Sequence, residues 1–322
     1  MSQQKIVVTG ATFPEAVTQR LHARGLTVVT VAGNLDEEGV VRELDGAWGY
    51  VLGGSERIGK EAWRRLPELK VVCFLGTGYS TFLELPEDRG PVRFTYTPHA
   101  NAVAVAEFGI GLMLDVVRRI STRAVGVGHG RWNEDSTPSL VGAKLGIVGM
   151  GHIGREVARM AKGAFGMDVH YWNRTPRPEL SDLGYTAADT VKDLCAQVDV
   201  LSVNCDYEPG GNDGIVGAAE LAALDGGHLV CTSRAELVDP TALRDALRSG
   251  SLKGAAIDGY YREPTPTAED DPYGLIALVP DKITITPHCA YLSTQAIRKM
   301  ADMTAANLLA VASGEHPPYE IP

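Results

Sequence analysis

Short apolar runs that alternate with helix-length stretches restrict the fold of this chain more than any other feature of its sequence. The first five runs each end in turn residues, and they cover residues 5–10, 27–31, 49–54, 71–76 and 93–98. Segments with helical spacing lie between them, for example residues 14–24 and 59–66. Near-continuous apolar strands separated by helices are typical of a parallel sheet that is covered on both faces.

A second series of the same kind follows a long apolar-rich stretch. Residues 101–120 end in a basic pair and predict one long helix, and a polar segment rich in Gly and Arg covers residues 121–138. The next expected strands are residues 144–151, 168–172, 198–205, 228–233, 254–260 and 283–288, and a last helix is expected over residues 293–312. Since 322 residues are too many for one ordinary core, we predict two doubly wound, parallel-sheet α/β domains.

The charge and the cysteines exclude several classes of function. A formal net charge of −10 leaves no basic face, so we expect neither nucleic acid nor an anionic membrane as a partner. No secretory signal pattern opens the chain, and no apolar run approaches the ~18 residues of a membrane span. The five cysteines form no CxxC pair, so we expect no disulfide framework, no metal site and a cytoplasmic location.

A glycine-rich loop between a strand and a helix predicts a dinucleotide site. The strand KLGIV runs into GMGHIG, in which Gly149 suits a tight turn, Gly151 a close approach of the pyrophosphate and Gly154 close packing of helix on strand. The phosphates would lie at the helix N-terminus, where backbone N–H groups lack partners. His152 and Ile153 belong to the same loop, and the imidazole itself is expected to face solvent or to pack. A tight turn without a ligand is the plainer alternative.

The end of the next strand bears on the choice of cofactor. An acidic residue there would bind the ribose hydroxyls of NAD, but the turn reads Asn173-Arg174-Thr175, and Asp168 lies at the wrong end of the strand. An Arg with a neighbouring hydroxyl suits a 2′-phosphate, which favours NADP(H) and leaves NAD(H) possible. In the alternative, Arg174 stacks on the adenine of an NAD enzyme.

Seven segments spread along the chain form a recognisable set of motifs: LGTGY (75–79), ANAVAVAEFGIGLML (100–114), GRW (130–132), LGIVGMGHIGREVARMAKGAFGM (145–167), TSRAELVDPTAL (232–243), AAIDGYYREP (255–264) and TPHCAYLST (286–294). In these motifs and their order, the sequence resembles the D-2-hydroxyacid dehydrogenase family, which includes glyoxylate/hydroxypyruvate reductases and phosphoglycerate dehydrogenases. The resemblance covers nearly the whole chain, and the turn NRTPRP (173–178) looks most like the NADP-preferring glyoxylate/hydroxypyruvate reductases. The resemblance implies a flavodoxin-like substrate domain at residues 1–100 and 291–322, a Rossmann cofactor domain at 101–290, and closure of the two over a cleft.

The resemblance also implies a catalytic set of Arg234, Glu263 and His288. Arg234 would bind the substrate carboxylate and polarise the carbonyl, because a guanidinium is a permanently charged fork. His288 would give a proton to the new alkoxide, and Glu263 would hold the imidazole and keep it protonated. Taken alone, Arg234 suits a surface charge, Glu263 a loop carboxylate and His288 a structural histidine. All three, however, follow strands at the edge where doubly wound sheets bind their ligands.

The same resemblance implies further contacts. Thr232 would bind the cofactor, and Asp258 would hold the nicotinamide carboxamide. Backbone amides at the turns around Gly53, Gly54, Gly76 and Thr77 would receive the substrate carboxylate. The helix over residues 104–120 would lie in a homodimer interface, although an apolar helix of this length also suits a buried core.

Departures from the family pattern leave the substrate open. Ala235 stands where a Gly is usual, Asp206 where a Pro is common, and Tyr291 follows the catalytic His at an unusual position. We expect reduction of a compact 2-oxo acid without phosphate, similar to glyoxylate or hydroxypyruvate, to its D-2-hydroxy acid. The alternatives are a corepressor-like protein that senses a dinucleotide, with an exposed partner groove and a low-complexity tail, and a phosphite-, formate- or phosphoglycerate-type dehydrogenase.

Overall fold

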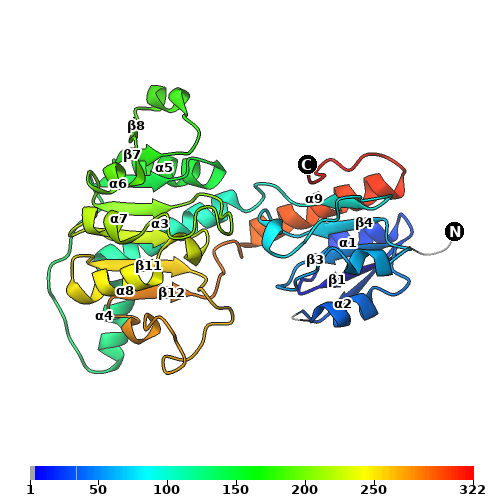
Figure 1. Cartoon of the computed structure of the whole chain (residues 1–322), viewed down its shortest axis with the longest axis horizontal. Helices are drawn as coiled ribbons and strands as arrows, with labels where there is room; N and C mark the ends of the chain where they lie inside the picture. Colours follow the sequence, from blue (N-terminus) through cyan, green and yellow to red (C-terminus); the bar gives the residue numbers. More distant parts are fainter. Residues whose placement is uncertain (1–3, 34) are drawn as a thin grey trace. The chain divides into compact units, whose positions relative to one another are not determined.

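The computed structural model describes residues 4–33 and 35–322, which form two compact units (Figure 1). Unit 1 contains the described residues up to Asn101 together with Leu292–Pro322, and unit 2 is Ala102–Tyr291. Each unit is built on its own parallel sheet flanked by helices, as in the expected α/β fold. Within the described residues, no helix is both long and apolar enough to cross a bilayer.

Unit 1 has a five-stranded parallel sheet in the order β2-β1-β3-β4-β5, which is the flavodoxin-like order. Its strands are β1 (Gln4–Thr9), β2 (Leu26–Val31), β3 (Gly49–Leu52), β4 (Val71–Phe74) and β5 (Arg93–Thr95). Its helices are α1 (Glu15–His22), α2 (Glu37–Glu43) and α9 (Thr294–Ala312), with 3-10 turns at η1 (Ala62–Arg65) and η2 (Tyr79–Thr81). The order confirms the predicted flavodoxin-like domain.

Alternate residues of the central strand of unit 1 enter opposite cores. Ile6 and Val8 pack with α1 and α9 on one face, and Val7 packs with α2 on the other. A strand buried on both faces must be apolar at every position, which explains the near-continuous apolar runs in the sequence.

Unit 2 has a seven-stranded parallel sheet in the order β12-β11-β10-β9-β6-β7-β8. Its strands are β6 (Lys144–Val148), β7 (Asp168–Trp172), β8 (Thr186–Ala187), β9 (Val200–Val203), β10 (His228–Cys231), β11 (Gly254–Asp258) and β12 (Ile283–Thr286). Its helices and 3-10 turns are α3 (Ala102–Arg118), α4 (Ile120–Gly128), α5 (His152–Phe165), η3 (Pro178–Leu183), α6 (Val191–Cys195), α7 (Ala218–Ala223), η4 (Ala235–Leu237), α8 (Pro240–Ser249) and η5 (Ile276–Leu278). The strand order reverses between β6 and β9, as in a Rossmann fold, which confirms the predicted architecture.

Helices cover both faces of the sheet of unit 2. Side chains of α3 and α5 form one core with the sheet, and side chains of α6, α7 and α8 form the other. The helix α3 therefore buries one face within its own unit, where it packs against α5 and the strands β10, β11 and β12.

Two predicted helices are wrong in detail. The helix expected over residues 101–120 ends at Arg118, because Arg119 has a left-handed backbone (φ 55°), and α4 begins immediately afterwards in the segment expected to be polar. Tertiary contacts hold α4 in place: Ser121 N–H donates to the Asp115 carboxylate (2.7 Å) and the Thr122 hydroxyl to the Pro280 carbonyl (2.7 Å). The helix expected over residues 59–66 is only the short turn η1, and Trp63 anchors it by an edge-on contact with Phe94.

Candidate active site

The loop between β6 and α5 has the form that a dinucleotide site needs. Gly149 has φ 96°, and a Cβ there would lie 2.6 Å from the Cα of Cys205. A Cβ on Gly154 would lie 2.1 Å from the Gly149 carbonyl oxygen. By contrast, no described atom lies within 4 Å of a Cβ placed on Gly151. Packing within the chain thus explains the first and third glycines, whereas Gly151 leaves space that a ligand can enter.

The N-terminus of α5 opens onto that space. Its N-cap residue is Gly151, and no side chain among the described residues caps the helix there. The first N–H groups of the helix are therefore free of a side-chain cap, and their partial positive charge suits a pyrophosphate. His152 is exposed, and Ile153 is half-buried against the core beneath the loop. These features fit a nicotinamide dinucleotide.

The side chain of Asn173 joins the turn after β7 to the glycine loop by a hydrogen bond. Its Oδ1 accepts a hydrogen bond from Met150 N–H (3.0 Å), and its Nδ2 donates to the Thr175 carbonyl (2.6 Å). Thr175 is exposed, and so is Arg174, whose guanidinium pairs with the Glu208 carboxylate (2.6 Å). The pairing and the charge of Glu208, together with Asp206, raise the pKa of Arg174 above its ordinary value.

The ends of β9 and β10 bring Asn204 and Thr232 together. Both side chains are buried, and the Thr232 hydroxyl lies 3.4 Å from the Asn204 Oδ1. The methyl group of Thr232 lies 3.5 Å from a Cβ placed on Gly109 of α3, so this side chain is wedged between strand and helix. The predicted cofactor contact of Thr232 stays a prediction.

Glu263 and His288 are in contact at the carboxyl ends of β11 and β12. The Nδ1 atom of His288 lies 3.1 Å and 3.2 Å from the two oxygens of Glu263. Tyr260 N–H also donates to Glu263 Oε1 (3.1 Å). Burial by itself raises the pKa of Glu263, but the hydrogen bond and charge of His288, the Tyr260 N–H and the charge of Arg234 together bring it below its ordinary value. Glu263 is therefore held as a carboxylate against one nitrogen of the imidazole, and Nε2 is left for other chemistry.

Asp258 organises the chain that carries His288. Its buried carboxylate accepts hydrogen bonds from the Thr286 hydroxyl (2.6 Å), Cys289 N–H (2.9 Å) and Ala290 N–H (2.8 Å). Between these contacts His288 adopts a left-handed backbone (φ 52°). This positioning role of Asp258 was not predicted, and its predicted contact with a carboxamide stays a prediction.

Two further side chains, those of Arg234 and Tyr291, lie near the Glu263–His288 pair. Arg234 follows β10 and is close enough for its charge to act on Glu263. Tyr291 presents its ring edge-on to the imidazole of His288, with ring centroids 6.4 Å apart. Ala235, which follows Arg234 in the sequence, is buried in a core of unit 2.

In unit 1, the predicted substrate-binding residues lie at the carboxyl ends of β3 and β4. A Cβ on Gly53 would lie 2.4 Å from the Ala11 Cβ, and one on Gly54 2.4 Å from Glu56 Oε2. A Cβ on Gly76 would lie 2.6 Å from the Phe74 ring. The Thr77 hydroxyl contacts the segment that follows β5, since it accepts from His99 N–H (3.3 Å). Close packing accounts for these glycines, and their binding of a carboxylate stays a prediction.

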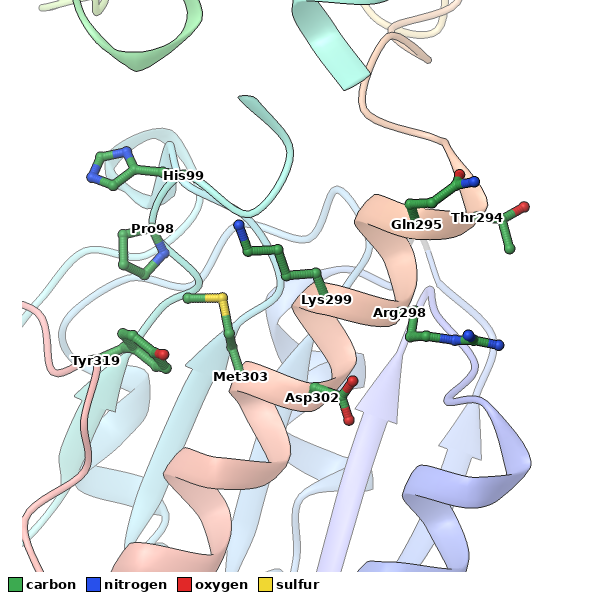
Figure 2. A pocket seen from close by; sticks show the side chains of 9 residues that line it. All are labelled: Pro98, His99, Thr294, Gln295, Arg298, Lys299, Asp302, Met303 and Tyr319. Atoms are coloured by element: carbon green, nitrogen blue, oxygen red, sulfur yellow. The ribbon is translucent and has the colours of Figure 1, made fainter. Parts of the chain in front are cut away.

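Unit 1 also contains an open cavity of about 740 Å³ beside the start of α9. Figure 2 shows Lys299 and Met303 pointing from α9 toward the chain at Pro98 and His99, whereas Arg298 points to another side of the helix. The predicted substrate-binding residues of unit 1 do not line this cavity. Over the described part of the chain, no group of three or more His, Cys, Asp or Glu side chains is placed to hold a metal ion.

The sequence analysis missed Glu208 and Asn204 as residues of this site. Both residues could have been predicted from the Rossmann strand order. That order reverses between β6 and β9, so the end of β9 lies beside the glycine loop that follows β6. The segment 204–213, with the sequence NCDYEPGGND, is also unusually acidic for a loop near a phosphate site.

Comparisons with known proteins agree with this geometry. The family model described as "D-isomer specific 2-hydroxyacid dehydrogenase, NAD binding domain" matches residues 110–290. A glyoxylate reductase of Thermococcus litoralis is 32% identical over 290 residues, which cover 86% of this chain and 83% of the relative. A D-3-phosphoglycerate dehydrogenase of Methanocaldococcus jannaschii is 27% identical over 93% of this chain and 57% of its own length. The crystal structure of a glyoxylate reductase from Paecilomyes thermophila superposes with a TM-score of 0.82, at 26% identity, over 100% of this chain and 99% of the other.

Proposed function

Because the chain belongs to the D-isomer-specific 2-hydroxyacid dehydrogenase family, we propose that it reduces a small 2-oxo acid to the corresponding D-2-hydroxy acid. The observation that carries this proposal is the contact between Glu263 and His288, on the sheet edge that also bears the open glycine loop. A nicotinamide dinucleotide, when bound, supplies the hydride for the carbonyl carbon.

The side chains of the site divide the rest of the chemistry between them. Arg234 binds the substrate carboxylate and polarises the carbonyl with its fixed positive charge. His288 gives the proton on Nε2 to the carbonyl oxygen as negative charge develops there. Glu263 accepts from Nδ1–H, so it sets the orientation of the ring and stabilises its protonated form.

The preferred cofactor in this proposal is NADPH. Arg174 and Thr175 follow the second strand of the Rossmann unit, where the adenosine ribose binds in such folds. Neither side chain is buried, so a 2′-phosphate can reach the guanidinium and form a charge-assisted contact. NADH remains usable, since the contacts of the glycine loop do not involve the 2′ position.

The proposed substrate is compact and carries no phosphate, as glyoxylate and hydroxypyruvate do. In unit 1 the turns at the ends of β3 and β4, residues 53–56 and 75–80, contain no Lys or Arg that could bind a phosphate. Arg57 is the nearest cation in sequence to Gly53 and Gly54, and its side chain is exposed. Relatives include both glyoxylate reductases and phosphoglycerate dehydrogenases, so the choice between them has to be measured.

A panel of 2-oxo acids tests the proposal, with NADPH or NADH oxidation followed at the nicotinamide absorbance. We expect glyoxylate or hydroxypyruvate to be reduced with a higher kcat/KM than 3-phosphohydroxypyruvate. A tenfold preference for the phosphorylated acid, about 1.4 kcal/mol, would require cationic contacts that the proposal denies. No oxidation with any 2-oxo acid would contradict the proposed reaction itself.

We also propose that the protein acts as a homodimer. Helix α4 and the segment that follows it expose several large apolar side chains of unit 2, namely Ile120, Val125, Val127, Trp132 and Val141. We propose that these side chains contribute to one apolar surface and that a second copy of the chain covers it, because contiguous exposed apolar patches mark interaction sites.

A further inference from the structure

The cation that would meet a 2′-phosphate already has an anionic partner. The Arg174 guanidinium lies 2.6 Å from Glu208 Oε1, with 73% of the Arg174 side chain and 51% of the Glu208 side chain exposed. Arg174 is on the turn after β7, whereas Glu208 is on the loop after β9. The pair therefore connects two loops at the edge where the adenosine end of a dinucleotide binds.

Hydrogen bonds within its own loop hold Glu208 in this place. Glu208 N–H donates to Asn212 Oδ1 (2.8 Å), and Asn212 Nδ2 donates to the Asp206 carbonyl (2.8 Å). Asp213 closes the same loop, because it accepts from the Tyr207 hydroxyl (2.6 Å) and from Gly210 N–H (2.6 Å). These hydrogen bonds stabilise the loop that carries Glu208, so the backbone of Glu208 is held within reach of Arg174.

The ion pair between Arg174 and Glu208 affects the binding of NADPH and of NADH differently. A 2′-phosphate carries nearly two negative charges, so it must compete with Glu208 for Arg174 and is repelled by the same carboxylate. A 2′-hydroxyl carries no charge and escapes both effects. We propose that Glu208 is a specificity-determining residue that restrains Arg174 and makes the preference for NADPH over NADH smaller than it would be without this carboxylate. This inference rests on the proposed use of a nicotinamide cofactor by the chain.

Direct titration of the full-length protein tests the inference without relying on turnover. We would measure Kd for NADPH and for NADH by nicotinamide fluorescence in the wild type and in Glu208→Gln. Removing the competing charge should tighten NADPH about three- to tenfold and leave NADH within about twofold. The gain should shrink in high salt, because exposed charges are screened.

Two further variants show whether the effect passes through Arg174. In an Arg174→Ala background, Glu208→Gln should change the ratio of the two Kd values less than it does with Arg174 present, because only the direct repulsion between Glu208 and the 2′-phosphate is left to remove. Glu61→Gln is the matched control, because Glu61 also forms an exposed ion pair with an arginine, Arg64 (2.7 Å), but in unit 1. It should alter neither Kd.

The possible outcomes separate this inference from the proposed reaction. An unchanged NADPH to NADH ratio in Glu208→Gln overturns the inference, and so does weaker NADH binding, which would mean that Glu208 binds the ribose hydroxyls. The shifted ratio in a protein that reduces no 2-oxo acid would uphold the inference and contradict the proposed reaction. A protein that binds neither dinucleotide would overturn both.

Discussion

His288 is the side chain on which the proposed reduction depends most directly. Glu263 holds its Nδ1, and Asp258 fixes the backbone that follows it through Cys289 and Ala290. We expect His288→Ala to lower kcat by about 10²- to 10⁴-fold, the usual contribution of a positioned general acid. The Kd of NADPH should stay within about threefold of wild type, because the imidazole acts on the substrate and not on the phosphates. Stopped-flow turnover and fluorescence titration measure the two quantities separately, and equal losses in both would contradict the assigned role.

Glu263 is the residue whose charge sets the pH range of the reaction. Its pKa is held below the ordinary value, so it stays a carboxylate throughout the neutral range and presents a negative charge to the imidazole. In Glu263→Gln the imidazole keeps a hydrogen-bond acceptor but loses the negative charge. The fall of kcat/KM for reduction with rising pH should therefore begin at lower pH than in the wild type. A pH–rate profile that coincides with that of the wild type would contradict the roles assigned to Glu263 and His288.

The residues of this pair were predictable only through the resemblance to a family. Composition and spacing alone leave Glu263 a loop carboxylate and His288 one of eight histidines. The role of Asp258 as an anchor for the following turn was not predictable, because it depends on two N–H groups about thirty residues later in the chain. The ion pair of Arg174 with Glu208 was also missed. The Rossmann strand order indicates that the loop after β9 lies beside the glycine loop, but the pairing of these two side chains depends on how that loop itself folds.

In the strand–loop–helix unit of β6 and α5, Gly154 is needed for packing, whereas we expect Gly151 to be needed for binding the dinucleotide. Gly154→Ala would place a methyl group 2.1 Å from the Gly149 carbonyl, so we expect a loss of more than about 3 kcal/mol of stability. Gly151→Ala meets open space and has an ordinary backbone (φ −75°), so its Tm should stay near that of the wild type. Its Kd for either dinucleotide should rise at least about tenfold, because the methyl group occupies the path of the pyrophosphate. Thermal unfolding and titration check both variants, and normal dinucleotide binding by Gly151→Ala would remove the glycine loop from the site.

Elements with strong periodic patterns were predicted well, and those held by tertiary contacts were not. The buried strands of both sheets followed from their apolar runs, because each is packed on both faces. Helix α4 was not predicted, since its sequence ISTRAVGVG contains two glycines and four β-branched residues, which have low helix propensity. The strand β8 has only two residues, too few for any alternation to be visible.

The proposed dimer depends on the surface formed by helix α4 and the segment that follows it. The side chain of Val127 is 55% exposed, and those of Trp132 and Val141 are exposed still further. A stable interface buries roughly 800 Å² on each partner and has an apolar centre, which these side chains can supply. We expect sedimentation at twice the chain mass of 34.4 kDa for the wild type.

A charge placed in that surface should break the dimer without unfolding the chain. Val127→Glu puts a carboxylate where the proposed interface excludes water, and burying an unpaired charge costs several kcal/mol, enough to move the equilibrium to the monomer at micromolar concentration. Leu183→Glu is the matched control, because Leu183 is also 55% exposed and belongs to the same unit but lies in η3, outside α4 and the segment that follows it. Analytical ultracentrifugation should give a monomer for Val127→Glu and a dimer for Leu183→Glu, with similar Tm values. A monomeric wild type, or a dimer that survives Val127→Glu, would show that a second copy does not cover α4.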